Sequence, residues 1–249
     1  MADPLSLSLI LVLIFFVAML YSSVGHGGAS GYLAVLSFFA VAPAEMSSTA
    51  LVLNLLVAGV GAYLYTKAGH LSWKLTWPFL VTSIPMAFVG GLLTVSDKIY
   101  FLLLAAVLLV AAVRLATAKN IAHNDSETSN LRLGVALPVG AGVGILSGIV
   151  GVGGGIFLSP LMIFMKWADP KRTAAVSALF IWVNSLAGLG GRFLRDALVF
   201  GDLLPLVVAA FLGGLLGSYV GANKFSGAML RRVLAIVLLI ASFKLVYAV

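Results

Sequence analysis

The sequence contains the stretch LSGIVGVGGGIFLSPLMIF at residues 146–164 and a looser copy of it, SSVGHGGASGYL, at residues 22–33. In both stretches a long apolar run ends at a group of glycines, and a second, shorter apolar run begins directly after it. Glycine lets the backbone turn sharply, so each stretch predicts a helix that ends and a short helix that starts. The two glycine clusters, Gly25–Gly28 and Gly151–Gly155, are the features from which the fold can be worked out.

The composition around these clusters is that of a membrane protein. Of the 249 residues, 62% are hydrophobic and 9% are charged, whereas soluble domains are about a quarter charged. A hydrocarbon core of about 30 Å needs roughly 20 apolar residues per helical span, and runs of that length recur along the chain. The net charge of +7 does not indicate nucleic-acid binding, because the basic residues lie at the ends of apolar runs. We predict an all-α integral membrane protein with the lipid bilayer, and no nucleic acid, as a partner.

The chain is predicted to consist of two related halves. The matched blocks keep their order along the sequence: Gly25–Leu33 with Gly151–Ser159, Asn54 with Asn184, and LLVAAVRLATA at 108–118 with LLIASFKLVYA at 238–248. The long polar stretch at residues 119–131 separates the two sets of matches. We therefore predict a first transmembrane repeat at residues 1–118, a polar cytoplasmic linker at 119–131 and a second transmembrane repeat at 132–249.

Each half is predicted to hold five hydrophobic segments, which in the first half lie at residues 5–24, 29–42, 46–66, 75–95 and 99–118. The second segment and its counterpart at 155–166 are short for a bilayer crossing, so they are either half-helices or short tilted spans. In either case the first two segments of a half together return to the side on which they began. An odd number of crossings per half remains, so the second repeat is expected to be inverted relative to the first.

The distribution of Lys and Arg predicts the orientation independently of hydropathy. With both chain termini placed outside, eleven of the fifteen Lys and Arg residues lie in inside loops and four lie outside. The four outside are Lys98, Arg192, Arg195 and Lys244. Inverted repeats with interrupted, glycine-containing segments at matching places are typical of secondary transporters.

The acidic residues indicate the charge of the substrate. All eight lie in termini, loops or segment ends, and none is placed in the middle of a predicted span. Proton relays and cation sites in membranes usually use buried Asp or Glu. Their absence from the spans favours an anionic substrate.

The glycine clusters can bind an anion without a buried cation. At the start of each short segment the first helical N–H groups lack internal acceptors, and the helix N-terminus carries partial positive charge. If the halves are inverted, both N-termini can face one central site and form an anion clamp from the main chain. The alternative is that these glycines only permit close helix packing, the role expected for Gly140, Gly144 and Gly148 and for Gly213, Gly217 and Gly221.

Polar side chains near the clusters are further candidates. His26 can donate to an anion or carry a coupled proton, or it can lie at the interface and bond water or headgroups. Asn54 and Asn184 can donate to the oxygens of an anion or join neighbouring helices. The predicted substrate-binding residues are Ser23, Gly25, His26, Gly27, Gly28, Asn54, Gly151, Gly153, Gly154, Gly155 and Asn184.

Other polar residues in the spans are weaker candidates. Arg192 can attract anions, but snorkelling to the interface is the more ordinary role of an arginine near a span end. Thr49, Ser177 and Ser185 are less favoured, because hydroxyls in spans commonly bond their own helix backbone. The chain has no cysteine, and the spans hold no nucleophile with a base and no set of metal ligands. We expect no enzyme activity, metal or cofactor.

At these residues the chain resembles the sulfite exporter TauE/SafE family of bacterial and plant membrane permeases. The resemblance covers essentially the whole chain, and it is carried by SSVGHGGASGYL, LSGIVGVGGGIFLSPLMIF and the AAVSALFIWVNSLAG that follows at 174–188. It implies transport of a sulfur-containing anion such as sulfite, sulfoacetate or a related sulfonate across a bacterial inner membrane, with the glycine-cluster residues as substrate site.

Together these observations predict a secondary transporter that works by alternating access around a midplane site, with both termini in the periplasm. An anion channel for the same substrates, or a transporter of another small anion such as a carboxylate, is the alternative. The exact substrate, the direction of transport, a coupling proton or ion, and assembly into a homodimer stay open.

Overall fold

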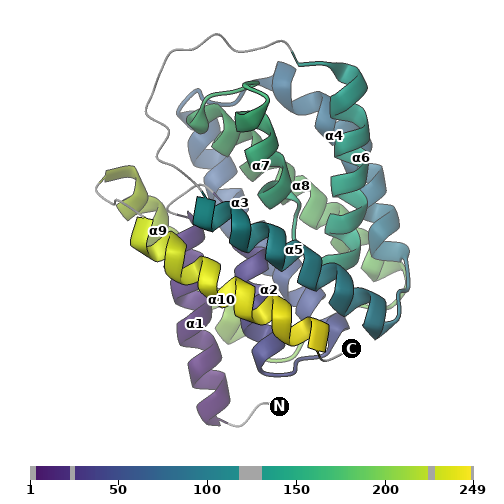
Figure 1. Cartoon of the computed structure of the whole chain (residues 1–249), viewed down its shortest axis with the longest axis vertical. Coiled ribbons are helices and arrows are strands. Elements are labelled where there is room, and N and C mark those ends of the chain that lie inside the picture. The colour runs from purple at the N-terminus through teal and green to yellow at the C-terminus, as the bar shows by residue number, and fades with distance from the viewer. Residues whose placement is uncertain (1–3, 23–25, 118–130, 224–227, 248–249) are drawn as a thin grey trace.

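The computed structural model describes residues 4–22, 26–117, 131–223 and 228–247 (Figure 1). Every regular element in these ranges is an α-helix, which confirms the predicted all-α membrane fold. The helices are α1 (Pro4–Ser22), α2 (Ala29–Phe38), α3 (Pro43–Lys67), α4 (Trp73–Leu92), α5 (Asp97–Thr117), α6 (Leu133–Val150), α7 (Gly155–Phe164), α8 (Pro170–Leu194), α9 (Leu203–Asn223) and α10 (Ala228–Tyr247). Within the described ranges, five of them, α1, α3, α4, α6 and α8, are long and apolar enough to cross a membrane. The predicted linker lies, apart from its last residue, outside the described ranges.

The helices that follow the glycine clusters, α2 and α7, are half-length. Each has ten residues, so each is about 15 Å long at about 1.5 Å per residue, half of a hydrocarbon core of about 30 Å. The chain turns at a left-handed residue after each of them, Ala40 (φ 54°) and Lys166 (φ 55°). A proline, Pro43 or Pro170, then begins the next long helix. Of the two alternatives left by the sequence, half-helices are therefore correct.

Both short helices begin at a glycine whose backbone only glycine adopts easily. The residue before α2 is Gly28, with φ 96° and ψ 0°, and the residue before α7 is Gly154, with φ 82° and ψ −15°. A side chain in this left-handed region costs roughly 1–2 kcal/mol. The glycine clusters thus allow each chain to turn directly into the first turn of a short helix.

The packing between the halves follows a two-fold pattern. Each helix of the first half is compared with the helix five places later in the chain, so that α1 corresponds to α6 and α4 to α9. Under this correspondence the α4–α6 contact matches the α9–α1 contact, and the α4–α8 contact matches the α9–α3 contact. All four contacts occur. The contacts α3–α8 and α5–α10 are their own counterparts, and both are extensive. Each half therefore buries its helices mainly against the other half.

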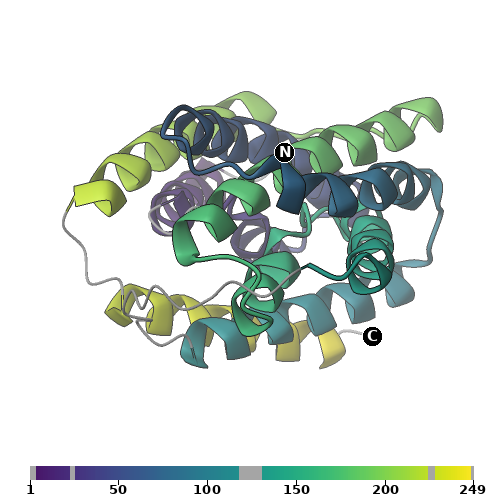
Figure 2. The same cartoon turned by 90° about the horizontal axis from the view of Figure 1, so that it is seen from above.

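The directions of the helices agree with the predicted inversion of the second repeat, which stays a prediction. In Figure 1, α1 rises from the N-terminus at the bottom, whereas its counterpart α6 descends from the top. The helices α5 and α10 run side by side in opposite directions. Figure 2 places this pair along one edge of the molecule.

Glycines allow the closest contacts between the halves. On α6, a Cβ atom added to Gly140, Gly144 or Gly148 would overlap the backbone of α4, and on α9 one added to Gly213 or Gly217 would overlap the backbone of α1. Without a hydrophobic driving force between helices in lipid, such close approach is a main source of association. The packing role predicted for these five glycines is confirmed, while the surroundings of Gly221 lie outside the description.

We expect Gly144→Ala to lower the thermal stability of the purified protein, because its Cβ would lie 2.7 Å from the Cα of Ser83 on α4. Overpacking of this kind costs about 1–3 kcal/mol. Gly142→Ala is the matched control on the same helix, since a Cβ there has no neighbour within 4 Å, and alanine favours a helix over glycine. Equal melting temperatures for the two variants, measured in one detergent, would contradict the close α4–α6 contact.

A second comparison separates backbone conformation from packing at the start of α7. Gly69→Ala introduces a side chain at φ +76° in open space, so it should cost only the left-handed conformation, about 1–2 kcal/mol. Gly154→Ala, at φ +82°, adds overlap with Val143 and Phe180, whose atoms would lie 2.6 and 2.7 Å from the new Cβ. The loss of stability in a thermal melt should therefore be larger for Gly154→Ala, and equal losses would indicate that the α7 start is loosely packed.

Candidate functional site

The two glycine clusters meet at the side chain of Asn54, near the middle of α3. A Cβ atom on Gly27, in the first cluster, would lie 2.6 Å from the Asn54 Oδ1, and one on Gly153, in the second cluster, would lie 2.7 Å from its Nδ2. Both glycines also lie against Ile181 of α8, at 3.2 and 2.7 Å by the same measure. Residues from the starts of both short helices are therefore brought to one buried place beside Asn54 and Ile181.

The amide of Asn54 has no hydrogen-bond partner among the described residues. The residue is 0% exposed, and neither its Oδ1 nor its Nδ2 is bonded. Ser185 is also 0% exposed, and its hydroxyl has no hydrogen-bond partner among the described residues. This hydroxyl would lie 3.2 Å from a Cβ atom added to Gly153. Leaving a buried polar group unpaired costs about 1–3 kcal/mol, so these groups are candidates for bonding a polar ligand. Among the described residues the Ser185 hydroxyl does not bond its own helix, which differs from the expectation for hydroxyls in spans.

Asn184 differs from its counterpart Asn54. It is also 0% exposed, but its Nδ2 donates to the Phe180 carbonyl in the preceding turn of α8, at 2.7 Å. Its Oδ1 has no partner. The Nδ2 of Asn184 thus bonds its own helix, and only its Oδ1 is left as an unbonded acceptor. In Asn54 both the Oδ1 acceptor and the Nδ2 donor are unbonded among the described residues.

The N-termini of α2 and α7 are not capped by side chains. Their first N–H groups have no acceptor within the helix and carry the positive end of the helix dipole. Gly27, Gly28, Gly153, Gly154 and Gly155, which lead into these termini, are all buried. Among the described residues, no Asp or Glu is buried. The site is therefore electropositive through its backbone.

Side chains close over the glycines. The Tyr32 ring lies over Gly28, and its hydroxyl donates to the Gly27 carbonyl at 2.8 Å. Gly154 is covered by Val143 and Phe180, and Gly155 lies against Ile181. The site is occluded in this conformation. Because a side chain at these glycines would also disturb packing, the alternative role in helix packing holds for them as well.

The other predicted site residues have different positions. Gly151 ends α6 in the left-handed conformation, and a Cβ there would lie 2.8 Å from the Ser47 carbonyl of α3, so close packing explains this glycine. Ser23 and Gly25 lie outside the described residues.

His26 connects the first glycine cluster to the second half of the chain. Its Nε2 lies 3.1 Å from the Arg114 Nη1 of α5 and 2.9 Å from the Ser159 Oγ of α7. Arg114 also donates to the Ile156 carbonyl at 3.2 Å, and Ser159 lies 2.7 Å from the Ser177 Oγ of α8. Four elements thus meet around one imidazole. In the sequence analysis Arg114 served only as one of the eleven basic residues that predict the orientation. Its alignment with Lys244 is the signal that could have drawn attention to it, because both halves then have a cation near the end of an apolar helix.

Arg192 does not snorkel to the surface as expected. It is 3% exposed, and its Nη2 donates to the carbonyls of Gly148 and Ile149 at 3.0 and 2.7 Å. These carbonyls belong to the last turn of α6, which lacks helical donors and carries partial negative charge. Arg192 therefore caps α6 from α8. Hydrophobicity and position could not reveal this, because the acceptor is backbone from a distant segment.

Comparison with known proteins agrees with this architecture. The family model of the sulfite exporter TauE/SafE matches residues 10–245. A probable membrane transporter protein of Sinorhizobium fredii, y4hK, is 33% identical over 237 residues, which are 94% of this chain and 95% of the relative.

More distant relatives carry the same description. A probable membrane transporter protein of Methanocaldococcus jannaschii, MJ0441, is 26% identical over 194 residues, covering 74% of this chain and 72% of its own. The Bacillus subtilis protein YunE, also a probable membrane transporter protein, is 27% identical over 123 residues, 49% of this chain and 45% of its own. No solved structure matches the chain significantly. On the match to nearly all of its length, this chain is a multi-pass membrane transporter that belongs to the TauE/SafE family.

Proposed function

We propose that the chain is a secondary transporter that carries a small sulfur-containing anion, sulfite or an organosulfonate, by alternating access. The observation that carries the proposal is Asn54: a fully buried amide, without a hydrogen-bond partner in the described part of the chain, lies between residues of the two glycine clusters. In this proposal the anion lies at the uncapped N-termini of α2 and α7 and accepts hydrogen bonds from their first N–H groups and from the Asn54 Nδ2.

The chemistry of the site favours an anion over a cation. A sulfite or sulfonate group presents several oxygens that only accept, so it suits converging N–H donors and needs no metal. Buried carboxylates, which a cation would require, are not found in the described part of the chain. The family description supports sulfite or a related sulfur anion as substrate.

The occlusion of the site supports a carrier over the alternative of a channel. A channel needs a continuous path, whereas Tyr32, Phe180 and Ile181 close over the glycines here. Because α2 and α7 are half-helices held on opposite halves, movement of one half against the other can expose their N-termini to either side in turn. A carboxylate substrate is the second alternative, because a carboxylate also accepts from N–H donors.

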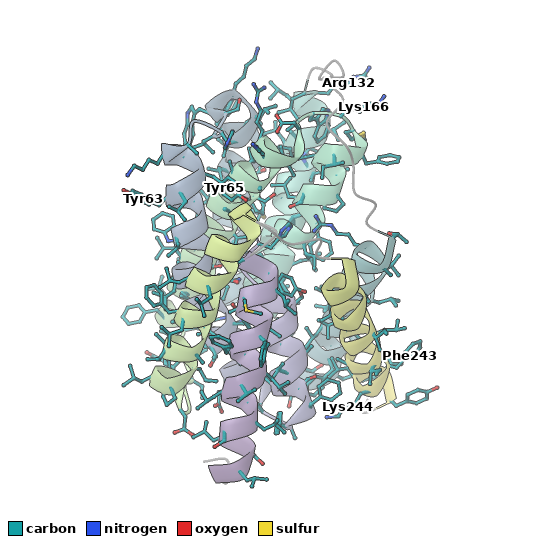
Figure 3. All side chains as sticks on the ribbon, turned by 90° about the vertical axis from the view of Figure 1, so that its left-hand side faces the viewer. Tyr63, Tyr65, Arg132, Lys166, Phe243 and Lys244 are labelled. Atoms are coloured by element: carbon teal, nitrogen blue, oxygen red, sulfur yellow. The ribbon has the colours of Figure 1, made fainter. Side chains whose placement is uncertain are left out.

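The proposed membrane is a bacterial inner membrane, with both termini in the periplasm. Figure 3 places Arg132 and Lys166 at one end of the molecule and Lys244 toward the other. The first two belong to the inside loops of the proposed orientation and the third to the outside, so their separation supports it.

We expect Asn54→Leu to abolish anion binding without loss of stability. Since the amide has no protein partner, its replacement by an apolar side chain of similar size removes an unpaired polar group and should leave the melting temperature equal or higher. Wild-type protein in detergent should melt higher with sulfite or sulfoacetate, since a ligand at 100 times its dissociation constant stabilises by about 2.7 kcal/mol. The variant should show no such increase.

The control for this experiment is Ser83→Ala. Ser83 is also buried and its hydroxyl is unpartnered, but it lies at the α4–α6 contact. This variant should keep the ligand-induced increase. An unchanged increase in Asn54→Leu would remove the amide from the site, and an increase with acetate but not with the sulfur anions would favour the carboxylate alternative.

We also expect counterflow in proteoliposomes. Vesicles preloaded with unlabelled sulfoacetate should transiently accumulate labelled sulfoacetate from outside, because a carrier exchanges one occupied site for another. A channel equilibrates the label without accumulation and without saturation. Flux that rises linearly with concentration, with no stimulation by internal substrate, would replace the carrier by the channel.

A further inference from the structure

The amide of Asn54 offers a hydrogen-bond acceptor as well as donors. Its Oδ1 would lie 2.6 Å from a Cβ atom on Gly27 and its Nδ2 2.7 Å from one on Gly153, so each polar atom adjoins a different glycine cluster. Neither atom is bonded among the described residues, and the residue is 0% exposed. Turning the amide over would exchange the two atoms but leave the same pair. A ligand that bonds the whole group must therefore both accept and donate.

A fully ionised anion satisfies only half of this amide. The Nδ2 can donate to an anion oxygen, as in the proposed function, but the Oδ1 would then face a second oxygen that also only accepts. Two acceptors in contact repel each other, and an acceptor left unpaired in a buried place weakens binding. The sulfite dianion carries no proton, so it would leave the Oδ1 of Asn54 without a partner.

Asn184 makes a bond that Asn54 does not make. At the corresponding place in α8, the Asn184 Nδ2 donates to the carbonyl of Phe180, four residues earlier, at 2.7 Å. The carbonyl four residues before Asn54 is that of Ala50, and the Asn54 Nδ2 is not bonded to it. Both polar atoms of Asn54 are therefore available together, which a two-point contact with one ligand requires.

A singly protonated oxyanion presents the matching pair of groups. In hydrogen sulfite a hydroxyl and an acceptor oxygen share one sulfur atom, so they lie side by side as the Oδ1 and Nδ2 of an amide do. Asparagine uses the same two atoms to pair with a neighbouring donor and acceptor on the edge of adenine. The Ser185 hydroxyl, which adjoins Gly153 as the Nδ2 does, can donate to a further oxygen of the ion.

The close packing beside the amide favours a ligand of this size. Cβ atoms on Gly27 and Gly153 would lie 3.2 and 2.7 Å from the Ile181 Cγ2. Tyr32 and Phe180 cover the next glycine of each cluster. Hydrogen sulfite is among the smallest oxyanions, whereas an organosulfonate adds a carbon chain that would need further room.

We propose that the site binds sulfite in its singly protonated form, with the Asn54 Oδ1 accepting from the hydroxyl and the Nδ2 donating to an oxygen. The inference rests on the proposed function and adds the protonation state of its substrate. The ion is carried intact, so each sulfite that crosses takes one proton with it and no side chain has to titrate. Affinity for total sulfite is full below the second ionisation of sulfite, near neutral pH, and falls as the pH rises through it, by up to about tenfold per pH unit.

Titration of the ligand has to be separated from titration of the protein. The titratable or charged side chains that contact or adjoin described residues close to the glycine clusters are Tyr21, His26, Tyr32, Tyr100, Arg114 and Arg192. Phenols and guanidinium groups keep their charge between about pH 6 and 8.5, whereas an imidazole titrates in this range. A change at His26 would act on every anion, so ligands of equal charge must be compared at the same pH.

The test compares sulfite with methanesulfinate in calorimetric titrations of the purified full-length protein. Methanesulfinate has the charge and shape of hydrogen sulfite, but a methyl group replaces the hydroxyl. At about pH 6, where sulfite is mainly hydrogen sulfite, we expect the wild type to bind sulfite at least about tenfold more tightly. At about pH 8.5 this preference should shrink, and sulfite should bind with uptake of about one proton more than methanesulfinate, measured in buffers of different ionisation enthalpy.

Three variants complete the experiment. Asn54→Leu should bind neither ligand more tightly than the wild type binds methanesulfinate, because both polar atoms are gone. Ser83→Ala is the matched control, since its buried hydroxyl is also unpartnered but lies at the α4–α6 contact, and it should keep the preference for sulfite. Ser185→Ala covers the case in which Asn54→Leu fails to fold. It should weaken both ligands and keep the preference, because its hydroxyl donates to an oxygen that both ligands have.

The outcomes separate this inference from the function on which it rests. Equal binding of the two ligands at the lower pH, or sulfite binding without the additional proton at the higher pH, would overturn the recognition of hydrogen sulfite and leave the anion transporter standing. A preference that is retained in Asn54→Leu or lost in Ser185→Ala would overturn the role of Asn54 in it. Absence of binding of sulfite, methanesulfinate and sulfoacetate at every pH would reject the transporter proposal and this inference with it.

Discussion

A short helix that begins inside a membrane protein presents N–H groups that lipid cannot bond. This constraint governs α2 and α7, because each is too short to place both ends in water and each begins at a buried glycine. Their N-termini must lie within protein, which requires long helices around them, and the long helices α3 and α8 supply Asn54 and Ile181 beside the glycines. The same N–H groups, left without helical acceptors, are the anion donors of the proposed function. Structure and proposed function thus depend on one set of unpaired amides.

The two halves share a scaffold but differ in the groups that face the site. Their packing is two-fold, from the left-handed glycines before the short helices to the glycine contacts of α6 with α4 and of α9 with α1. The polar side chains do not follow this pattern, since Asn54 is unpaired whereas Asn184 bonds its own helix. His26 likewise has a valine, Val152, at its counterpart position. Two helix N-termini therefore start at similar glycines, while the polar side chains around them differ.

Glycine serves two purposes that the sequence cannot separate. At Gly144 and Gly213 it removes a side chain so that two backbones approach. At Gly28 and Gly154 it adopts a left-handed conformation that begins a helix. In the second group the missing side chain also leaves room for Tyr32 over Gly28 and for Val143 and Phe180 over Gly154, so both purposes constrain the same atoms. We therefore expect a substitution in the glycine clusters to change both the stability and the proposed anion binding. A substitution of Asn54 should change the binding without lowering the stability.

The sequence by itself determined the membrane environment, the helical segments and the place of the short helices, because these follow from local hydropathy and from where glycine interrupts it. It also indicated the asparagines and His26, since polar groups in apolar spans are few. Only the tertiary structure decided which of these groups are bonded: that Arg192 caps α6, that Asn54 is left unpaired, and that Arg114 contacts His26. Each of these depends on a partner from a distant segment, and the distance between segments is set by helix packing, which no local pattern encodes.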